Sequence, residues 1–416
     1  MIVEMGKLFY SYCSIDCQPV YYDDLYEYLS SDEPVIINSI ISKTETLFKN
    51  LVKAICYNVD LTLFDEDIAQ SEKIKLVENN KNVGQIPVES KLIRSLAELR
   101  ECFFNSTSEL TIFTSGTTGQ PKKVTHTIKN LIRNVKIDNG HQSDVWAFTY
   151  SATHMAGLQV FFQALLNENP IFDVYAKSKQ VVFKALRENK ISHISATPTF
   201  YRLLLPTNLE FPFIRRVSLG GEKSDRILIE KIKLIFPNAV VNNIYASTEA
   251  GTLLATKDDF FFIPAPLKSL IKIVNNEILV HTSILGKITN LNNPIDDWYH
   301  TNDIVEWVDE SSGYFRISSR KNEMINVGGY KVNPHEIEDI LSIIEGVLGV
   351  VAYGKANSVL GNILCCNIQK DESCNLTEAD FKIILKERLA DYKIPRRIYF
   401  VDKIEVAKSG KQLRKL

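Results

Sequence analysis

The order of apolar and polar positions predicts helices and strands that alternate along the first two thirds of the chain. Residues 23–29 and 39–57 carry apolar side chains at helical spacing, and Ile128, Leu131, Ile132 and Val135 fall at i, i+3, i+4 and i+7 of another helix face. Further helices are predicted at residues 160–166 and 181–186, and strands at residues 110–113, 192–195 and 239–242. This alternation indicates a largely parallel α/β sheet.

The pattern changes from residue 271 onward. Short strands with tight turns are predicted at residues 272–274, 278–280 and 314–317. A helix at 334–344 follows, with Pro334 in the first turn, where the missing N–H costs nothing. Strands at 349–353 and 363–368 and a helix at 378–390 complete the chain. We expect two domains, residues 1–319 and 320–416.

Composition narrows the class of protein. The 416 residues exceed what one hydrophobic core usually serves, and 45% hydrophobic with 24% charged residues is typical of globular proteins. A formal net charge of −2 gives no general attraction to nucleic acid or anionic lipid. No apolar run approaches the ~20 residues of a membrane span, and the early Glu4 is untypical of a secretion signal. We expect a cytoplasmic protein that binds no nucleic acid and spans no membrane.

The seven cysteines are odd in number and scattered, which favours reduced thiols. A zinc site at Cys13 and Cys17 is the alternative, although no histidine or second cysteine pair lies at ligand spacing.

The clearest chemical signal is a loop at residues 114–123 that follows the apolar run 110–113. Its glycines allow a close backbone approach, and its hydroxyls, free N–H groups and a lysine suit phosphate oxygens. It is not a Walker loop, because only two residues separate its glycines. The plainer alternative is a polar surface loop. The phosphate-binding candidates are Thr114, Ser115, Gly116, Thr117, Thr118, Gly119 and Lys122.

This loop, TSGTTGQPKKV, resembles the phosphate loop of the acyl-adenylate-forming superfamily, which includes acyl- and aryl-CoA synthetases, peptide-synthetase adenylation domains and luciferases. Lys123 stands where that family usually has glycine. The resemblance extends from about residue 110 to the end and is nearest to a short acyl- or aryl-CoA ligase. It implies a large N-terminal domain of mixed and parallel sheets flanked by helices, with a small β-barrel-like part. It also implies a small, mobile α+β C-terminal domain that rotates about a hinge near Asn322.

The resemblance assigns nucleotide contacts to residues 242–251. Asn243 is expected to bond the adenine amino group and Tyr245 to stack on the ring. Thr248 would contact the α-phosphate, and Glu249 would bind Mg²⁺. Each role suits the side chain: an amide, an aromatic plane, a hydroxyl and a hard anionic oxygen.

Three further segments complete the expected nucleotide site. Gly221 and Glu222 resemble the loop that lines the adenine pocket. Asp303 would accept hydrogen bonds from the ribose hydroxyls, and Arg320 would contact ribose or phosphate. Asn302 replaces the family's glycine before that aspartate, and both residue types tolerate left-handed backbone angles.

The acyl pocket is expected beside His154, Gly220 and Ala246. A satisfied core histidine is the alternative for His154. No acidic residue occurs between residues 151 and 163, and a buried ammonium without a counter-charge is costly, so a plain carboxylic acid is favoured over an α-amino acid. Ala246 replaces the usual glycine and would narrow the pocket.

The resemblance also places Lys411, in the segment 407–414, on the catalytic lysine. Gly328, Gly329 and Tyr330 match a loop that lines the tunnel for the acceptor thiol. The catalytic set is therefore Lys411, Thr248 and Glu249.

The expected function is ATP-dependent activation of a carboxylic acid as an acyl-adenylate, with Mg²⁺, followed by transfer to the thiol of CoA or of phosphopantetheine. Two alternatives stay open: a stand-alone adenylation enzyme that loads a carrier protein, and a nucleotide-binding protein without turnover. A monomer or a homodimer is expected.

Overall fold

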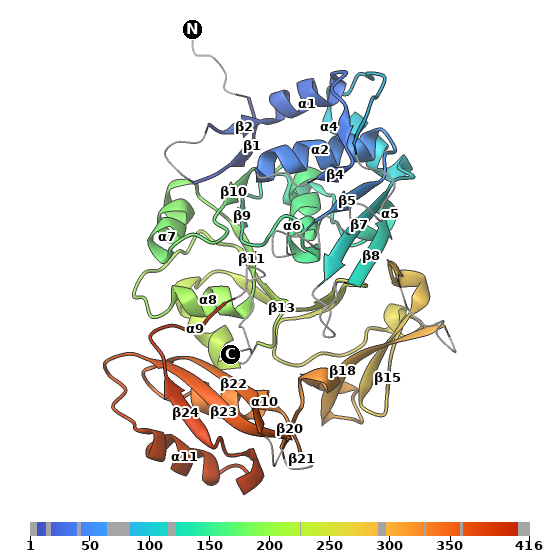
Figure 1. The fold of residues 1–416 in the computed structure, drawn as a ribbon. Helices are drawn as coiled ribbons and strands as arrows, with labels where there is room; N and C mark the ends of the chain where they lie inside the picture. Colours follow the sequence, from blue (N-terminus) through green and yellow to red (C-terminus); the bar gives the residue numbers. More distant parts are fainter. Residues whose placement is uncertain are drawn as a thin grey trace.

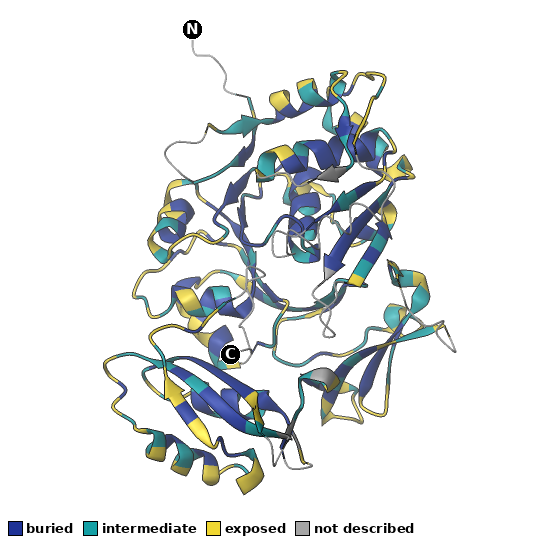
Figure 2. Cartoon of the chain, in the orientation of Figure 1, coloured by how far each residue is buried: buried dark blue, intermediate teal, exposed yellow. Residues whose placement is uncertain are grey.

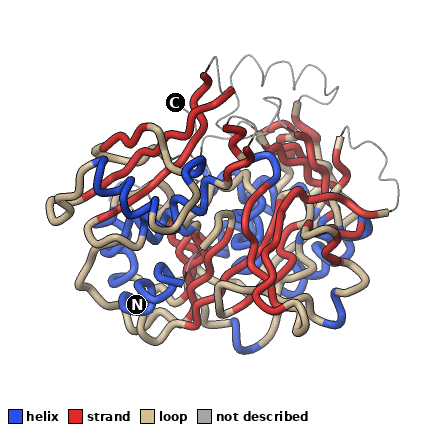
Figure 3. The backbone as a smooth tube through the Cα atoms, turned by 90° about the horizontal axis from the view of Figure 1, so that it is seen from below, coloured by secondary structure: helices blue, strands red, loops and turns tan. Residues whose placement is uncertain are grey.

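The structure is a computed structural model that describes residues 6–13, 18–39, 43–64, 84–114, 122–224, 226–289, 297–327, 330–357 and 361–406, with the backbone alone at 38, 39, 114, 322, 326 and 331 (Figure 1). Within these ranges, no helix is long and apolar enough to cross a membrane. Strands lie between helices in the view from below (Figure 3).

The largest sheet has eight strands among the described residues. Neighbouring strands, in order, are β14 (Gly251–Thr256), β13 (Val240–Ser247), β12 (Arg216–Gly220), β11 (His193–Ala196), β9 (Trp146–Phe148), β10 (Ile171–Asp173), β1 (Leu8–Ser11) and β2 (Val20–Tyr21). Its interior pairs are parallel, and the pairs β13–β14 and β1–β2 at its edges are antiparallel. The predicted, largely parallel sheet is confirmed.

The two faces of this sheet differ in character. Ile194, Val217 and Val241 pack with α7 (Lys179–Glu188), α8 (Pro198–Leu204) and α9 (Arg226–Ile235) in one apolar cluster. Because side chains alternate along a strand, their neighbours Ser195, Ser218 and Asn242 lie on the opposite face, where they are only half-buried.

A second sheet lies beside the first. Its strands are β17 (Lys287–Ile288), β8 (Lys122–Thr127), β7 (Glu109–Thr114), β5 (Leu61–Leu63) and β4 (Asn38–Ser39), and the pair β3 (Val35–Ile36) and β6 (Gln85–Ile86) lies apart. Helices α1 (Tyr22–Ser30), α2 (Thr44–Cys56), α4 (Leu96–Asn105) and α6 (Met155–Leu165) share the core with it.

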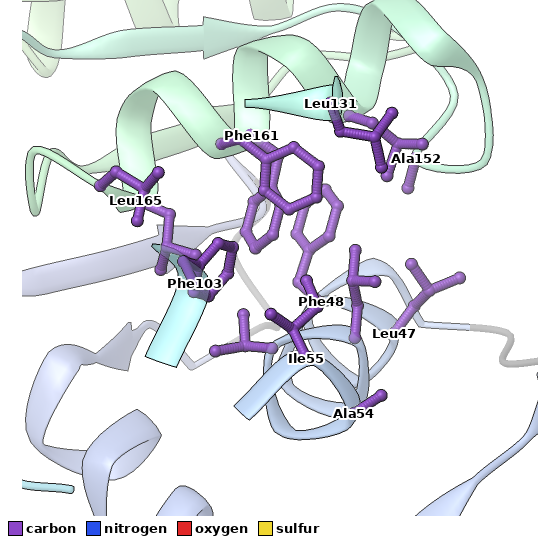
Figure 4. Packing of buried hydrophobic residues seen from close by; sticks show 14 of the residues in the cluster. Leu47, Phe48, Ala54, Ile55, Phe103, Leu131, Ala152, Phe161 and Leu165 are labelled. Atoms are coloured by element: carbon purple, nitrogen blue, oxygen red, sulfur yellow. The ribbon is translucent and has the colours of Figure 1, made fainter. Parts of the chain in front are cut away.

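Aromatic contacts join these helices (Figure 4). The rings of Phe48 in α2 and Phe161 in α6 stack with centroids 3.8 Å apart and planes 7° apart. Phe103 of α4 meets Phe162 edge-on at 5.8 Å. Full burial of each such side chain contributes roughly 1.5–3 kcal/mol. The central strands β9 and β10 and most of α2 are accordingly dark blue in Figure 2.

The helix predicted at residues 128–135 is shorter than expected. Only α5 (Ile128–Leu131) is helical, and a turn follows it. Ile132 and Val135 still pack against the core, so the apolar spacing was interpreted correctly for burial but not for length. The β-branched residues favour helix weakly, and the hydrogen bonds of Arg133 hold the chain in the turn.

The later part of the chain forms two further sheets. The first, in the region expected to be barrel-like, is antiparallel and contains β15 (Ile271–Val274), β16 (Glu277–His281), β18 (Trp298–Asp309) and β19 (Tyr314–Arg320). The second contains β21 (Tyr330–Val332), β20 (Ile325–Val327), β23 (Gly361–Lys370), β22 (Val347–Asn357) and β24 (Arg397–Phe400), with α10 (Pro334–Ser342) and α11 (Glu378–Lys386). Short 3₁₀ turns are η1 (Asn139–His141), η2 (Ala265–Leu267), η3 (Thr282–Ile284), η4 (Lys321–Glu323) and η5 (Asp391–Lys393).

This second sheet and its helices, orange to red in Figure 1, form a small α+β unit with its own core. The helix α10 begins as predicted, with Pro334 in its first turn and the Asn333 side chain accepting from the backbone N–H of His335. The expected fold class, a large mixed α/β part followed by a small α+β part, is confirmed.

Candidate functional site

One cleft of about 1860 Å³ gathers the described residues predicted to bind nucleotide and acid. It opens where β11, β12 and β13 end, the edge at which open α/β sheets commonly bind ligands. Its lining includes Lys122, His154, Gly220, Gly221, Glu222, Asn243, Tyr245, Ala246, Thr248, Glu249, Asp303 and Arg320. Glu323 and Asp339 of the C-terminal part also border it, and Lys223 donates to Asp339 at 2.7 Å.

Asp303 is the centre of the polar site. It is 3% exposed, one oxygen accepts from the Tyr245 hydroxyl at 2.6 Å, and the other accepts from Arg320 Nε at 2.6 Å. The β18–β19 register places Asp303 directly opposite Arg320. A carboxylate offers about four lone-pair positions, so Asp303 keeps acceptor capacity for two hydroxyls of a ligand.

Electrostatics fix the protonation states of this triad. Burial, reinforced by the charge of Asp303, raises the pKa of Tyr245, so its hydroxyl stays a donor. Burial opposes the charge on Arg320, but the Asp303 carboxylate outweighs it and raises the pKa of the guanidinium. Tyr245 is therefore a neutral donor and Arg320 a cation, and both donate to the Asp303 carboxylate.

The turn before Asp303 has the left-handed backbone that was expected to be tolerated by Asn302 in place of glycine. Asn302 has φ +63°, in the left-handed region. Its backbone N–H donates to Glu277 at 3.0 Å, and Glu277 also accepts from Lys321 at 2.7 Å and His300 at 3.1 Å. Burial disfavours the charge on Glu277, but the bonds from Lys321 and His300 outweigh it and lower the pKa of Glu277. Lys321 thereby ties η4 to the four-stranded sheet.

Thr248 and Glu249 lie in the turn after β13, and buried side chains hold this turn. Neutral His126 donates from Nε2 to the carbonyl of Thr248 at 2.9 Å, and burial lowers its pKa. The backbone N–H of Gly286 donates to the carbonyl of Glu249 at 2.8 Å, and the Tyr299 hydroxyl contacts Glu249 Oε1 at 3.5 Å.

Arg133 also holds the turn that contains Thr248 and Glu249. Its guanidinium donates to the carbonyls of Ala250, of Thr252 at 3.3 Å and of Ile284 at 2.8 Å. His126, Arg133 and Glu277 were missed by the motif-based interpretation, because their partners are mostly backbone groups distant in sequence. The available signal for Arg133 was a charge within an apolar helix pattern.

Replacing Arg133 with methionine is expected to destabilise the chain by roughly 2–4 kcal/mol, because buried carbonyl groups lose their donors. The loosened Thr248–Glu249 turn should also weaken ATP binding. Denaturant unfolding and ATP titration would measure both effects, with the exposed Arg187→Met as the matched control. Unchanged unfolding in the Arg133 variant would contradict this role.

The segment Gly220–Gly221–Glu222 borders the cleft at the end of β12. Gly221 has φ +83°, which favours glycine. Glu222 Oε2 accepts from the Thr199 backbone N–H at 2.9 Å and from its hydroxyl at 2.6 Å. Glu222 thus caps the first turn of α8, so its backbone faces the cleft from a fixed position.

His154 precedes α6 and borders the cleft together with Gly220 and Ala246. It is half-buried, unlike a residue enclosed in the core. The glycine three residues later has a steric reason: a Cβ at Gly157 would lie 2.2 Å from the carbonyl oxygen of Ser151. Gly157 therefore lets α6 start close to the loop that carries His154.

Several predicted residues lie outside the described ranges: Ser115, Gly116, Thr117, Thr118, Gly119, Gly328, Gly329, Lys411 and, of the possible zinc pair, Cys17. The phosphate loop joins Thr114 and Lys122, which pair across β7 and β8, and Lys122 borders the cleft. Asn322 lies in η4, between two sheets. Tyr330 is 59% exposed, stacks on Tyr392 at 4.5 Å, and does not line the cleft.

A polar cluster lies at the opposite end of the large sheet, where His141 and His193 also border the cleft. Ligand atoms of His141, Asp144 and His193 lie within 4.8 Å of one another. Asp144 accepts from His141 at 2.7 Å, His193 at 3.3 Å and Arg215 at 2.9 Å. Since the guanidinium already supplies the counter-charge, we interpret the cluster as a hydrogen-bond network that closes the start of β11.

This network predicts acid sensitivity. Burial, then the charges of Arg215 and Arg216, lowers the pKa of His193 to about 3. The unfolded chain takes up a proton near pH 6.5 and the folded chain near pH 3, so the stabilisation is full above about pH 6.5 and is lost as the pH falls through this window.

We expect a loss on the order of a few kcal/mol between pH 7 and pH 4, measured by urea unfolding. His193→Gln should flatten the pH profile, whereas His281→Gln, at a half-buried histidine outside this network, should leave it unchanged. Equal slopes in all three proteins would contradict the assignment.

Comparison with known proteins agrees with the geometry. The family model described as AMP-binding enzyme matches residues 64–276, and the model of the AMP-binding enzyme C-terminal domain matches residues 336–411. The 2-succinylbenzoate–CoA ligase of Listeria monocytogenes is 26% identical over 409 residues, covering 90% of this chain and 86% of its own. The oxalate–CoA ligase of Arabidopsis thaliana is 24% identical over 394 residues, with 84% and 76% covered.

Solved structures share the fold. The o-succinylbenzoate CoA synthetase of Bacillus subtilis, in complex with an acyl-adenylate intermediate, matches with a TM-score of 0.68 at 19% identity, over 98% of this chain and 94% of that chain. ATP-bound MatB of Rhodopseudomonas palustris matches with a TM-score of 0.73 at 14% identity, over 99% and 95%.

Proposed function

We propose that this chain, which belongs to the family of AMP-binding enzymes, is an AMP-forming acid–CoA ligase. The observation that carries the proposal is the Tyr245–Asp303–Arg320 triad, which shares one cleft with the acyl-pocket residues His154, Gly220 and Ala246. The family relationship and the CoA-ligase relatives support it.

In the first half-reaction a carboxylate oxygen attacks the α-phosphorus of ATP, and pyrophosphate leaves. Asn243 and Tyr245 would receive the adenine, and Asp303 would accept the ribose hydroxyls while Arg320 neutralises its charge. The phosphates would extend past Thr248 toward Lys122 and the loop before it. With the reactants held this way, displacement becomes an oriented reaction within the site.

The residues also fit a magnesium ion. Glu249 borders the cleft, and its weak 3.5 Å contact with Tyr299 leaves carboxylate oxygens of the hard type that Mg²⁺ prefers. When bound, the ion would offset negative charge on the phosphates. The turn held by His126 and Arg133 fixes where that carboxylate lies.

The second half-reaction requires the C-terminal domain to move. We place the domain boundary at residues 319/320 and the hinge near Asn322, in η4 between the two sheets. The pairs Lys223–Asp339 and Lys321–Glu277 would hold the domains in one arrangement. Rotation would withdraw Lys411 and bring Gly328, Gly329 and Tyr330 to the cleft as the thiol tunnel. Of these, Tyr330 is exposed.

The acceptor is proposed to be CoA, as in the names of the relatives. A carrier protein bearing phosphopantetheine stays the alternative, and so does a monomer or a homodimer. A cytoplasmic location is supported by the cysteines, because six of them form no disulfide bond among the described residues.

The test is carboxylate-dependent pyrophosphate release over fatty, aryl, keto, dicarboxylic and amino acids, with and without CoA. We expect release with a non-amino acid and a faster steady state with CoA. ATP binding without pyrophosphate release from any acid would instead favour the nucleotide-binding alternative, and indifference to CoA would favour a carrier protein.

A further inference from the structure

The cleft continues beyond the acyl-pocket residues, along the polar face of the large sheet. Gly220 and Ala246 lie at the end of the cleft where the substrate carboxylate would be activated. Ser218, Asn242 and Ser195 line the cleft farther from that end. The parallel registers place Ser195 beside Ser218 and Ser218 beside Asn242. These three half-buried side chains therefore form one row of hydrogen-bonding groups across β11, β12 and β13.

The helix α6 borders the same cleft with both apolar side chains, Met155, Ala156 and Val160, and polar ones, Gln159 and Gln163. Gln159 of α6 borders it and is held by the Thr252 hydroxyl, which donates to its Oε1 at 3.1 Å. Burying hydroxyl and amide groups under a hydrocarbon chain would leave them without partners, which costs roughly 1–3 kcal/mol for each group. The groove is therefore suited to an acid whose body carries polar atoms.

The far end of the groove has more donors than acceptors. Arg216 borders it and is half-buried, and no described carboxylate forms an ion pair with it. Its chain neighbour Arg215 is bound instead to Asp144 at 2.9 Å. Trp146, also at this end, is 8% exposed, and its Nε1–H has no acceptor among the described residues.

The other group at this end does not supply a negative charge. His193 pairs in register with both Arg216 and Trp146, and its two ring nitrogens are engaged by Ser192 at 2.9 Å and Asp144 at 3.3 Å. Its Asp144 partner is already shared with Arg215 and His141. The guanidinium of Arg216 thus borders the groove without a fixed counter-ion among the residues that the structure describes.

Strand geometry sets the length of the groove. Arg216 precedes Gly220 by four residues on β12, and a strand rises about 3.3 Å per residue, so their Cα atoms are about 13 Å apart. We propose that Arg216 binds a second anionic group at the far end of an elongated substrate, so that the enzyme prefers dicarboxylic acids to monocarboxylic acids of equal length. This rests on the proposed acid–CoA ligase activity.

The physical reason is the pairing of a partly buried cation. A guanidinium forms two parallel, charge-assisted hydrogen bonds with a carboxylate, and these are roughly twice as strong as neutral ones. A monocarboxylic acid of the same length would instead cover Arg216 with a methyl end and leave the charge unpaired, which is strongly unfavourable. Selectivity would come from both effects.

The test compares pyrophosphate release from α,ω-dicarboxylic acids, 2-succinylbenzoate and monocarboxylic acids of matching length, in the wild type, Arg216→Ala and Arg216→Lys. Arg216→Ala should lower kcat/KM for the preferred diacid by roughly 10–100-fold, mainly through KM, with about threefold or less change for the monoacid. Arg216→Lys should restore part of the loss. Arg187→Ala, which removes an exposed guanidinium on α7, is the matched control.

ATP affinity should be unchanged in Arg216→Ala. Unchanged ATP binding would show that the variant is folded and that the loss is specific to the diacid. Equal losses for diacids and monoacids would overturn the proposal, as would a diacid-specific loss in Arg202→Ala with none in Arg216→Ala, since Arg202 borders the same cleft. Wild-type activity with monoacids only would overturn it while leaving the ligase function intact. Absence of pyrophosphate release with every acid would overturn both the diacid preference and the proposed ligase function.

Discussion

Replacing Lys411 with alanine is expected to stop acyl-adenylate formation while sparing thioester formation from a supplied acyl-adenylate. The lysine would bridge the attacking carboxylate and the α-phosphate, where negative charge builds up in the transition state. Removing one such donor typically costs ~10²–10³ in rate. Stopped-flow pyrophosphate release would measure the first half-reaction, and CoA thioester formation from synthetic acyl-adenylate the second.

Lys408→Ala is the matched control, because it removes the same charge from the same segment three residues earlier. It should leave both half-reactions within about threefold of the wild type, because the resemblance assigns the catalytic role to Lys411 and no role to Lys408. Undiminished adenylation in Lys411→Ala would remove this residue from the mechanism. Equal loss of both half-reactions would mean that it serves folding or domain placement instead.

Asp303→Ala is expected to have the second large effect, on ATP binding. It removes the acceptor for the ribose hydroxyls, and it leaves the Arg320 guanidinium and the Tyr245 hydroxyl without the partners that hold them at 2.6 Å. Losing two or more charge-assisted contacts should lower kcat/KM for ATP by roughly 10²–10⁴-fold.

Asp309→Ala, at the exposed end of the same strand β18, controls for the loss of one carboxylate. Direct titration with ATP and with AMP would show whether the Asp303 effect lies in binding. An unchanged KM for ATP would contradict the assignment of Asp303 to the ribose. Loss of the folded state in Asp303→Ala would be separated from this by Asp303→Asn, which keeps the shape and an acceptor oxygen.

The parts of the fold that sequence predicted well are those governed by local periodicity. The strand predicted at residues 192–195 appears in the structure as β11, and the strand predicted at residues 239–242 as the first half of β13. The same rule placed β7 before the phosphate loop and Pro334 in the first turn of α10. Such patterns depend on neighbours in the chain, and therefore a single sequence reveals them.

The parts that sequence missed depend on tertiary contacts. Arg133 lies within the helix predicted at residues 128–135, but the helix ends before it, and its guanidinium donates to carbonyl groups more than a hundred residues away. Glu277 carried no motif, because its partners Lys321 and His300 approach only when β16 and β18 pair. In each case the role of the residue depends on a backbone group or on a side chain that is distant in the sequence.

The acyl groove illustrates the same limit. The motifs named His154, Gly220 and Ala246 at its activated end, whereas the row Ser195–Ser218–Asn242 becomes visible only through the register of three strands. An alternating polar face on consecutive predicted strands was the available signal. It could not show which strands are adjacent, and so it could not show a continuous groove.

The central claim, that a carboxylate attacks the α-phosphate of ATP, is tested most directly with an acid carrying ¹⁸O in its carboxyl group. With CoA present, the account predicts AMP containing one ¹⁸O atom, because the attacking oxygen stays on phosphorus when the thiol displaces AMP from the acyl carbon. Formation of ADP with the label in inorganic phosphate would contradict it, since the acid would then have attacked the γ-phosphate.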